Sequence, residues 1–321
     1  MKKILLLILL LSGTIAGVSQ NAVCTYDFLR HLNYLASDSM QGRLPGSHHD
    51  SLAATYIRSE LLAYGYKPLF ENGRQQFPCD AQSGFSHNVV MLYMPDNGTP
   101  ATETIVLGAH FDHVGHGEYG RRGGSFGEIY NGADDNASGV AMMLELAKKL
   151  AGNAETSKRN IMAVAFSAEE QGLVGSEYFV RHVPPQAQHI VLMVNFDMVG
   201  RLDSLRNFYI GGIGTFAQAD SMLHAAPNPD SLRLNFAYSG TGPSDHTSFY
   251  DQDIPILFLF TGLHDDYHTP ADDVEKINIH GMHAIARFVE PIIQWAVTST
   301  EPPVFQTVDY EHRSDWRKWL E

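Results

Sequence analysis

The stretch IMAVAFSAEEQGLVGSEYF occupies residues 161–179 and indicates how this chain folds. Its first six residues are all apolar, which is typical of a strand that is buried on both faces of a sheet. Two glutamates follow at positions 169 and 170, and a helical pattern begins near Leu173. The stretch therefore predicts a strand, an acidic turn and a helix, in that order.

The same alternation of apolar strands and helices extends in both directions. Further strands are expected at residues 88–94, 104–107, 190–195, 208–210, 232–238 and 254–260. Helices are expected within 26–66 and at 137–151, 173–180, 216–225 and 279–297, the last bent or restarted at Pro291. Strands of this kind need cover on both faces, so we predict a three-layer α/β sandwich with a mostly parallel central sheet.

The first 19 residues have the pattern of a secretory signal peptide. Lys2 and Lys3 precede an apolar run over residues 4–11, and we expect cleavage after Ser19. The alternative is a membrane anchor, but the run is much shorter than the roughly 20 residues that span a bilayer. We predict an exported protein, periplasmic or extracellular, with one catalytic domain over residues 20–321. This domain includes a helical segment at 26–66 and a tail at 301–321 to which the sequence assigns no role.

The composition limits the classes of partner. The formal net charge is −14, and removal of Lys2 and Lys3 with the signal peptide makes it −16. A chain this acidic has no evident means of binding phosphate backbones, and we therefore expect no nucleic-acid partner. After cleavage of the signal peptide we expect no stable membrane anchor. In an oxidising compartment Cys24 and Cys79 could form a disulfide or remain two free thiols.

Five short segments each supply one side chain that could bind a metal ion. Three of them come directly after predicted strands, at the sheet edge where α/β proteins place their sites. The candidate ligands are His110, Asp135, Glu170, Asp197 and His268. Their oxygen and nitrogen donors suit zinc, with Co²⁺ or Mn²⁺ possible in vitro. Together the segments predict a hydrolase site with two metal ions.

His110 and Asp135 each have a structural alternative. Asp112 lies two residues beyond His110, so on an extended chain it could steady the imidazole, but the pair could also be a polar strand end. Asp135 could cap a helix. One acidic residue would suffice for a cap, however, and Asp134 stands beside it. Two dications about 3.5–4 Å apart need a bridging carboxylate, and we assign this role to Asp135.

Some of the remaining candidates could bind a metal ion, and others could transfer protons. Adjacent Glu169 and Glu170 could share these tasks, or could form a solvated charged pair at a helix start. Asp197 ends an apolar strand, where an unpaired carboxylate would be costly. His264 is an alternative to His268 as the last ligand. We expect His113 and His116 to face solvent or to shape their loop.

These segments, in this order, resemble the zinc-dependent exopeptidase family that includes bacterial leucyl aminopeptidase, aminopeptidase Y and the glutaminyl cyclases. They are GAHFDHVG at 108–115, NGADDNASGV at 131–140, SAEEQGLVGSEYF at 167–179, NFDMVG at 195–200 and DDYHTPADD at 265–273. The resemblance runs from LASDSMQGR at 35–43 to the final helix. It implies a mixed sheet of about eight strands and two Zn²⁺ ions per chain.

The resemblance also implies a role for each matching residue. Asp135 would bridge both ions, Glu170 and His268 would complete one site, and Glu169 would be the general base. His110 and Asp197 would complete the other site.

The segment PSDHTSF at 243–249 resembles a further family segment near the substrate pocket, with Asp245 and His246 as its polar members. Its alternative is a helix-capping turn. Thr241 stands where some family members carry a tyrosine that stabilises the oxyanion, so Tyr238 or Tyr267 would have to substitute for it.

The expected function is aminopeptidase activity on peptides with a free N-terminus. The two ions would activate a water molecule, and Glu169 would accept its proton and return it to the leaving amine; Asp112 would assist at the catalytic centre. One alternative is a glutaminyl cyclase, for which the resemblance implies a single zinc and Ala-Glu-Asp in place of Ala168-Glu169-Glu170. Carboxypeptidase-type or other amide hydrolysis is another. A catalytically silent binding protein on this scaffold is the last, although every ligand position and the base are filled.

Overall fold

The computed structural model describes residues 26–79, 84–95, 101–152, 157–312 and 314–319. The predicted signal peptide and Cys24 lie outside these residues, as does any pairing of Cys24 with Cys79.

One mixed sheet runs through the molecule, with the strand order β1-β3-β5-β4-β6-β9-β7-β8, and β2 pairs with β3. The four central strands pair in parallel, whereas β3 and β7 join them in antiparallel fashion on either side. The strands are β1 (Lys67–Pro68), β2 (Arg74–Pro78), β3 (Phe85–Tyr93), β4 (Thr104–His110), β5 (Asn160–Phe166), β6 (Ile190–Phe196), β7 (Asn207–Gly211), β8 (Arg233–Phe236) and β9 (Ile256–Phe260). The predicted mixed α/β sheet is confirmed.

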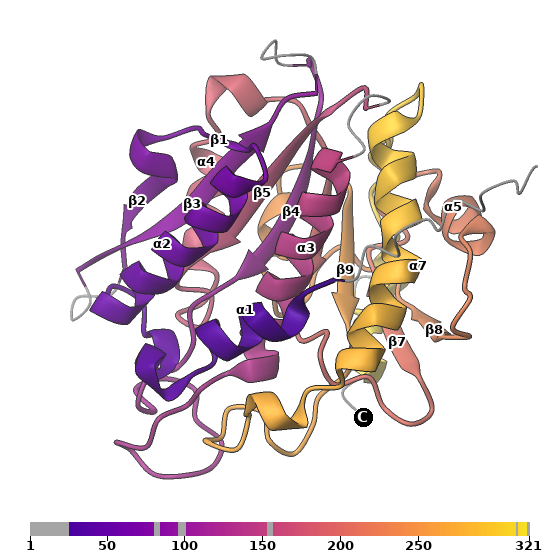
Figure 1. The fold of residues 1–321 in the computed structure, drawn as a ribbon. Helices are drawn as coiled ribbons and strands as arrows, with labels where there is room; N and C mark the ends of the chain where they lie inside the picture. The colour runs from indigo at the N-terminus through magenta and orange to yellow at the C-terminus, as the bar shows by residue number, and fades with distance from the viewer. Residues whose placement is uncertain (1–25, 80–83, 96–100, 153–156, 313, 320–321) are drawn as a thin grey trace, which may run out of the picture.

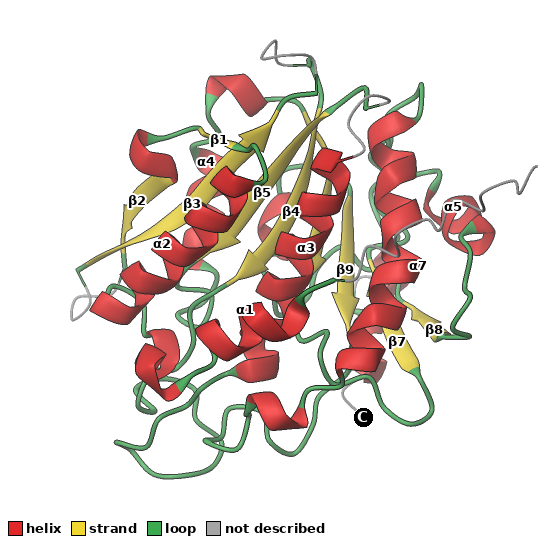
Figure 2. Ribbon diagram, in the orientation of Figure 1, coloured by secondary structure: helices red, strands yellow, loops and turns green. Residues whose placement is uncertain are grey.

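Helices cover both faces of this sheet, so the three-layer prediction is also confirmed (Figures 1 and 2). One face carries α1 (Phe28–Leu35), α2 (His48–Ala63), α3 (Gly139–Gly152) and α7 (Ile279–Thr298), with α5 (Ala219–Ala225) beside α7. The other carries α4 (Val174–Arg181) and α6 (His246–Tyr250). Strands β4 and β5 are buried along their whole length, as their apolar sequences require.

Several details differ from the sequence-based expectations, among them the course of α7 and the start of α3. α7 runs through Pro291 as one helix, so it does not restart there; a long buried face holds it against the core despite the hydrogen bond that proline removes. α3 begins at Gly139 rather than at residue 137, because an irregular turn over Ala133–Ser138 precedes it.

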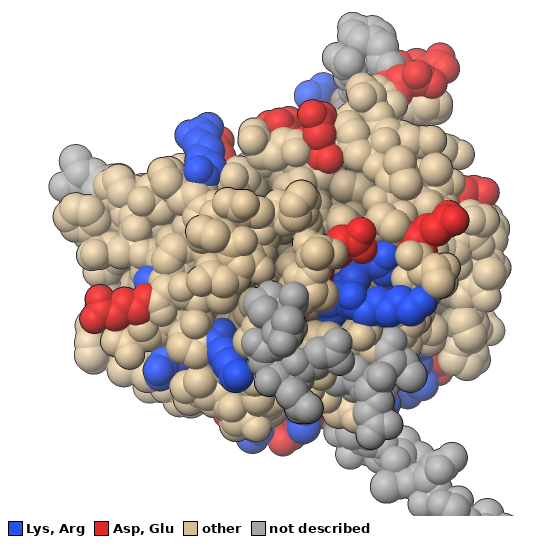
Figure 3. Space-filling model, turned by 90° about the horizontal axis from the view of Figure 1, so that it is seen from above, with Lys and Arg blue, Asp and Glu red and all other residues tan. Residues whose placement is uncertain are grey.

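Among the described residues, none of the helices combines the length and apolar character that a bilayer span requires. Viewed from above, basic side chains are scattered over the surface, and some of them lie beside acidic ones (Figure 3). On the face shown there, uncharged residues cover most of the surface.

Candidate metal centre

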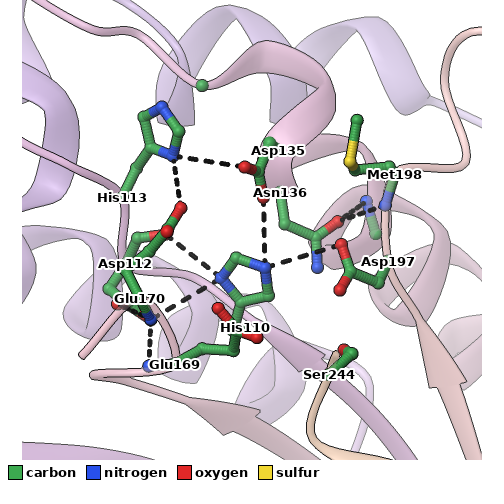
Figure 4. A network of polar contacts seen from close by, with 12 residues as sticks. His110, Asp112, His113, Asp135, Asn136, Glu169, Glu170, Asp197, Met198 and Ser244 are labelled. Atoms are coloured by element: carbon green, nitrogen blue, oxygen red, sulfur yellow. Dashed lines mark hydrogen bonds and ion pairs between the residues drawn. The ribbon is translucent and has the colours of Figure 1, made fainter. Parts of the chain in front are cut away.

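Asp135 lies between two groups of candidate ligands (Figure 4). Its Oδ1 is 3.3 Å from Nε2 of His110, and its Oδ2 is 2.9 Å from Nε2 of His268. The first group continues to Asp197, whose Oδ1 is 3.6 Å from the same His110 nitrogen. The second continues to Glu170, whose Oε2 is 3.1 Å from the same His268 nitrogen. The five predicted ligands thus converge as two sets that share one carboxylate.

The topology explains this convergence. His110 ends β4, and Glu170 and Asp197 lie in the turns that follow β5 and β6. His268 lies in the loop after β9. These four strands are parallel neighbours, so their carboxyl ends meet at one edge of the sheet.

The turn that presents Asp135 is built by its surroundings. Gly132 precedes it with φ 57°, and a Cβ on Gly132 would lie 2.6 Å from the His113 ring. The carboxylate of Asp272 accepts the backbone amides of Asp134 and Asp135, at 3.0 and 3.1 Å. Glycine at 132 and the buried Asp272 therefore fix where the bridging carboxylate stands.

Asp134 has a different task from Asp135. Its Oδ1 accepts the amide of Gly200 and the hydroxyl of Ser138, and its Oδ2 is 3.2 Å from Nε2 of His264. The two adjacent aspartates therefore have different roles. Asp134 connects the turn to neighbouring segments, whereas Asp135 faces the two groups of candidate ligands. His264, the alternative to His268, pairs with Asp134 and is absent from both groups of candidate ligands.

The expectation that His113 faces solvent is wrong. The side chain is fully buried, and its Nδ1 lies 3.0 Å from Oε1 of Glu170 and 3.8 Å from Oδ2 of Asp135. The loop after β4 turns the ring inward, against Gly132. His116 does shape its loop, through contacts of its ring nitrogens with Gln41 and the carbonyl of Gly127.

Asp112 connects the first ligand to the acidic turn. Its backbone carbonyl is 3.3 Å from Nδ1 of His110, and its two carboxylate oxygens accept the amides of Glu169 and Glu170. Asp112 is completely buried. It therefore orients both the imidazole and the two glutamates without facing the cleft.

The charges around the centre are unbalanced. Burial alone would lower the pKa of His110, but the carboxylates of Glu169 and Asp197 raise it well above its ordinary value. Burial, together with Glu170, Asp245 and Asp197, also raises the pKa of Glu169 well above its ordinary value. Asp135 Oδ2 and His268 Nε2 face one another, yet neither has a well-directed hydrogen bond within the described residues. Buried carboxylate oxygens and imidazole nitrogens that lack hydrogen-bond partners and carry surplus negative charge are suitable ligands for divalent cations.

The segment 243–249 borders the centre. Asp245 precedes α6 without capping it through its side chain, and burial raises the pKa of this carboxyl to about 7. His246 stacks on Phe258, with ring centroids 4.3 Å apart. The helix-capping interpretation of Asp245 therefore finds no support in its hydrogen bonds.

Of the two tyrosines considered for the oxyanion, one faces the cleft. Tyr267 lines it and stacks on His268, with centroids 3.9 Å apart, and the guanidinium of Arg122 lies 4.6 Å above the Tyr267 ring. Tyr238 is 42% exposed and packs on His312 instead. Thr241 lines a separate hollow with Tyr250.

Two buried residues from the N-terminal part support the centre from behind. Arg43 donates to the carbonyls of Leu35, Phe111, Asn131 and Gly132, and so joins the loop after β4 to the turn that holds Asp135. Asp50 accepts the hydroxyls of Ser167 and Ser86 and the amide of Gly46. Ser167 immediately precedes the turn with Glu169, so Asp50 fixes the base of that turn.

Residues 88–293 match the sequence profile of peptidase family M28. Aminopeptidase YwaD of Bacillus subtilis is 27% identical over 230 residues, which are 68% of this chain and 46% of that protein. The chain thus spans about half the length of this relative.

Two solved structures share the fold. BSAP, a zinc aminopeptidase of Bacillus subtilis, superposes with a TM-score of 0.68 at 16% identity, over 85% of this chain and 95% of that one. The glutaminyl cyclase of Porphyromonas gingivalis superposes with a TM-score of 0.68 at 20% identity, over 83% and 96%.

Proposed function

Because the chain belongs to peptidase family M28, we propose that it is an exported two-zinc aminopeptidase that removes N-terminal residues from peptides. The observation that carries the proposal is the position of Asp135, whose two oxygens face two separate groups of ligands. A shared carboxylate is the device that lets two dications lie close together. The similarity to relatives described as aminopeptidases supports the same reading.

The proposed ligands divide as the geometry suggests. His110 and Asp197 would hold one ion, and Glu170 and His268 the other, with Asp135 between them. Imidazole and carboxylate donors without a thiolate suit zinc. His113 would orient Glu170 through the 3.0 Å contact between its Nδ1 and Oε1.

The reaction then depends on what the side chains do with protons. When bound, the ions would polarise the scissile carbonyl and make water more acidic. Glu169 is the one carboxylate of the cleft that is neither a proposed ligand nor a buried support, and it lines the open space beside His110. It would accept the proton of the attacking water and return it to the leaving amine.

A free N-terminus fits this cleft for electrostatic reasons. Glu169 lines it and is not a proposed ligand, so a bound ion would not neutralise this carboxylate, and an α-ammonium group would be attracted to it. An acetylated N-terminus would lose that attraction. This is why we assign exopeptidase rather than endopeptidase activity.

Glutaminyl cyclase activity is the second candidate, because a cyclase shares the fold over most of the chain. A cyclase transfers the acyl group within its substrate and forms pyroglutamate with loss of ammonia, whereas a peptidase adds water. The pair Glu169 and Glu170 favours hydrolysis, since it supplies one carboxylate for a metal and one for the proton.

The test uses the purified mature protein with its metal content determined. Aminoacyl-p-nitroanilides, their N-acetylated counterparts and N-terminal glutaminyl peptides are compared before and after chelation. Release of p-nitroaniline from the free amines only, abolished by chelation and restored by zinc, is the expected result. Pyroglutamate formation without hydrolysis would make the protein a cyclase, and no turnover by the fully metallated protein would leave a binding role.

A further inference from the structure

Two kinds of residue line the cleft beside Asp135. The first kind is polar or charged and comprises His110, Arg122, Asp135, Glu169 and Asp197. Most of the others are apolar. The apolar wall, as we call this set, consists of Met198, Phe258, Phe260, Leu263, Trp316 and Trp319. The volume of the cleft is about 170 Å³. A cavity of about 150 Å³ is enough to hold a benzene ring, so this space suits one large side chain.

The two tryptophans come from the tail, residues 301–319, which follows α7. The tail returns across the sheet edge through backbone contacts. The amide of Gln306 donates to the carbonyl of Thr215 at 2.7 Å, and the amide of Val308 donates to the hydroxyl of Tyr250 at 3.1 Å. The sequence assigned this segment no role, and the structure brings it to the cleft.

Polar contacts fix the tail on both sides of Trp316. The carboxylate of Asp315 accepts the amides of Tyr238 and Ser239, at 2.8 and 3.1 Å, just beyond the end of β8. Nζ of Lys318 donates to the carbonyl of Phe236 at 2.8 Å. These anchors hold the short helical turn Asp315–Trp319 in one orientation.

Trp319 is also held by rings of the sheet. Its indole lies 5.3 Å from the ring of Tyr209, between centroids, and a Cβ on Gly211 would lie 3.4 Å from Cη2. The indole therefore packs against the ring of Tyr209 and close to Gly211. Trp316 and Trp319 stay partly exposed, which keeps their faces available to a ligand.

We infer that the indoles of Trp316 and Trp319 form the wall of the pocket that receives the side chain of the substrate's N-terminal residue. The inference rests on the proposed aminopeptidase function and names its substrate class: peptides whose first residue is large and apolar, above all aromatic. An apolar side chain gains by leaving water against this wall. A charged side chain would lose hydration against these apolar residues.

The experiment compares kcat/KM for phenylalanyl-, leucyl- and alanyl-p-nitroanilide. In Trp319→Ala and in Trp316→Ala the preference for phenylalanyl over alanyl substrate should fall roughly tenfold or more, while the alanyl rate changes little. Trp295→Ala is the matched control, because Trp295 lies on α7 beside a different hollow. It should leave the preference unchanged.

A second pair of variants leaves the wall residues themselves intact. Asp315→Ala removes the carboxylate that accepts the amides of Tyr238 and Ser239, so the preference for phenylalanyl over alanyl substrate should also fall. Asp309→Ala, at an exposed position of the same tail, should not change it. Melting temperatures of all variants show whether a loss reflects unfolding, and Asp315→Ala keeps the test decisive if a tryptophan variant does not fold.

The outcomes separate this inference from the proposed function. If the tryptophan and Asp315 variants keep turnover and an unchanged preference for phenylalanyl over alanyl substrate, the role of the two indoles is contradicted. The proposed aminopeptidase function is then unaffected. Absence of turnover of every substrate by metallated wild-type protein would overturn the aminopeptidase itself.

The wall has a readout that does not need turnover. Two of the three tryptophans lie in it. In a Trp295→Phe background, L-phenylalaninamide should therefore change the intrinsic fluorescence at lower concentration than L-alaninamide. Equal responses to the two amides would overturn the inference.

Discussion

The carboxylate of Asp112 accepts the backbone amide of Glu169 at 3.1 Å, and its second oxygen accepts the amide of Glu170 at 3.3 Å. Through its own carbonyl, the same residue contacts Nδ1 of His110. Asp112 thus sets the positions of the proposed base and of one proposed ligand in each group.

Asp112→Asn should weaken zinc binding and lower kcat/KM, each by roughly 10–100-fold, because an amide offers one acceptor oxygen in place of two. Zinc affinity is measured by competition with a chromogenic chelator, and kcat/KM with the best p-nitroanilide. Asp203→Asn is the control, since the carboxylate of Asp203 also accepts a backbone amide, that of Asn207, but on an exposed loop. Wild-type zinc affinity in Asp112→Asn would contradict the orienting role.

Glu169→Gln should keep its zinc and lose turnover by roughly 10²–10⁴-fold, the usual contribution of a general base. The change is nearly isosteric, so the cleft should keep its shape. Metal analysis and kcat are measured on the same preparation. Glu177→Gln, on the exposed side of α4, is the matched control. Full activity in Glu169→Gln would end the assignment of the base.

Asp135→Asn should lose the response of stability to zinc. In the wild-type protein, bound cations would neutralise the clustered carboxylates, so chelation should lower the melting temperature and zinc should restore it. Removing the shared carboxylate should abolish most of this shift. Thermal melts with chelator and with zinc give the measurement, and Asp220→Asn, at an exposed position of α5, should behave as wild type. A full zinc-dependent shift in Asp135→Asn would argue against the bridge.

Arg43→Lys should lower the free energy of unfolding, because one ammonium cannot reach four separate carbonyls. Each buried carbonyl left without a donor costs roughly 1–3 kcal/mol. Arg287→Lys, in an exposed pair with Asp230, should cost less than about 1 kcal/mol. Denaturant titrations compare the two, and equal losses would show that Arg43 does not hold the loops together.

Asp50 should make stability depend on pH. Burial raises the pKa of its carboxyl to about 7 in the folded protein. The folded state therefore holds this proton more tightly than the unfolded state. The resulting stabilisation is complete below about pH 4 and is lost as the pH rises to about 7.

Asp50→Asn removes this titration. The stability of the variant relative to the wild type should therefore increase between about pH 4 and about pH 7, as measured by denaturant unfolding. Asp203→Asn, which changes an exposed carboxylate, gives the baseline. Parallel pH profiles for Asp50→Asn and the wild type would show that Asp50 is ionised throughout.

Much of the sheet, and of the ligand positions at its edge, could be predicted from the sequence, because the ends of buried strands can be recognised in it. Runs such as residues 161–166 are apolar on both faces, and the first polar residues after them lie at the sheet edge. The strands β1 and β2 could not be predicted in this way. They are short and partly exposed, and they exist because β3 offers them an edge.

The inward orientation of His113 could not be predicted from the sequence pattern. His113 lies one residue beyond Asp112, and nothing in its neighbours signals that the loop turns its ring toward Glu170. That inward turn depends on Gly132, nineteen residues later, which has no side chain to occupy the same space. Contacts between distant loops of this kind leave no local signature in a sequence.

Arg43 has a consequence for how this protein can be shortened or rebuilt. Every proposed ligand lies at or beyond position 110, so a version that began at β3 would carry a complete set of metal-binding side chains. It would lack the guanidinium that clamps two of the loops presenting them. The N-terminal helices are therefore part of the structure that would hold the ions. A shortened protein without them would keep every proposed ligand but would lose the support that brings these ligands together.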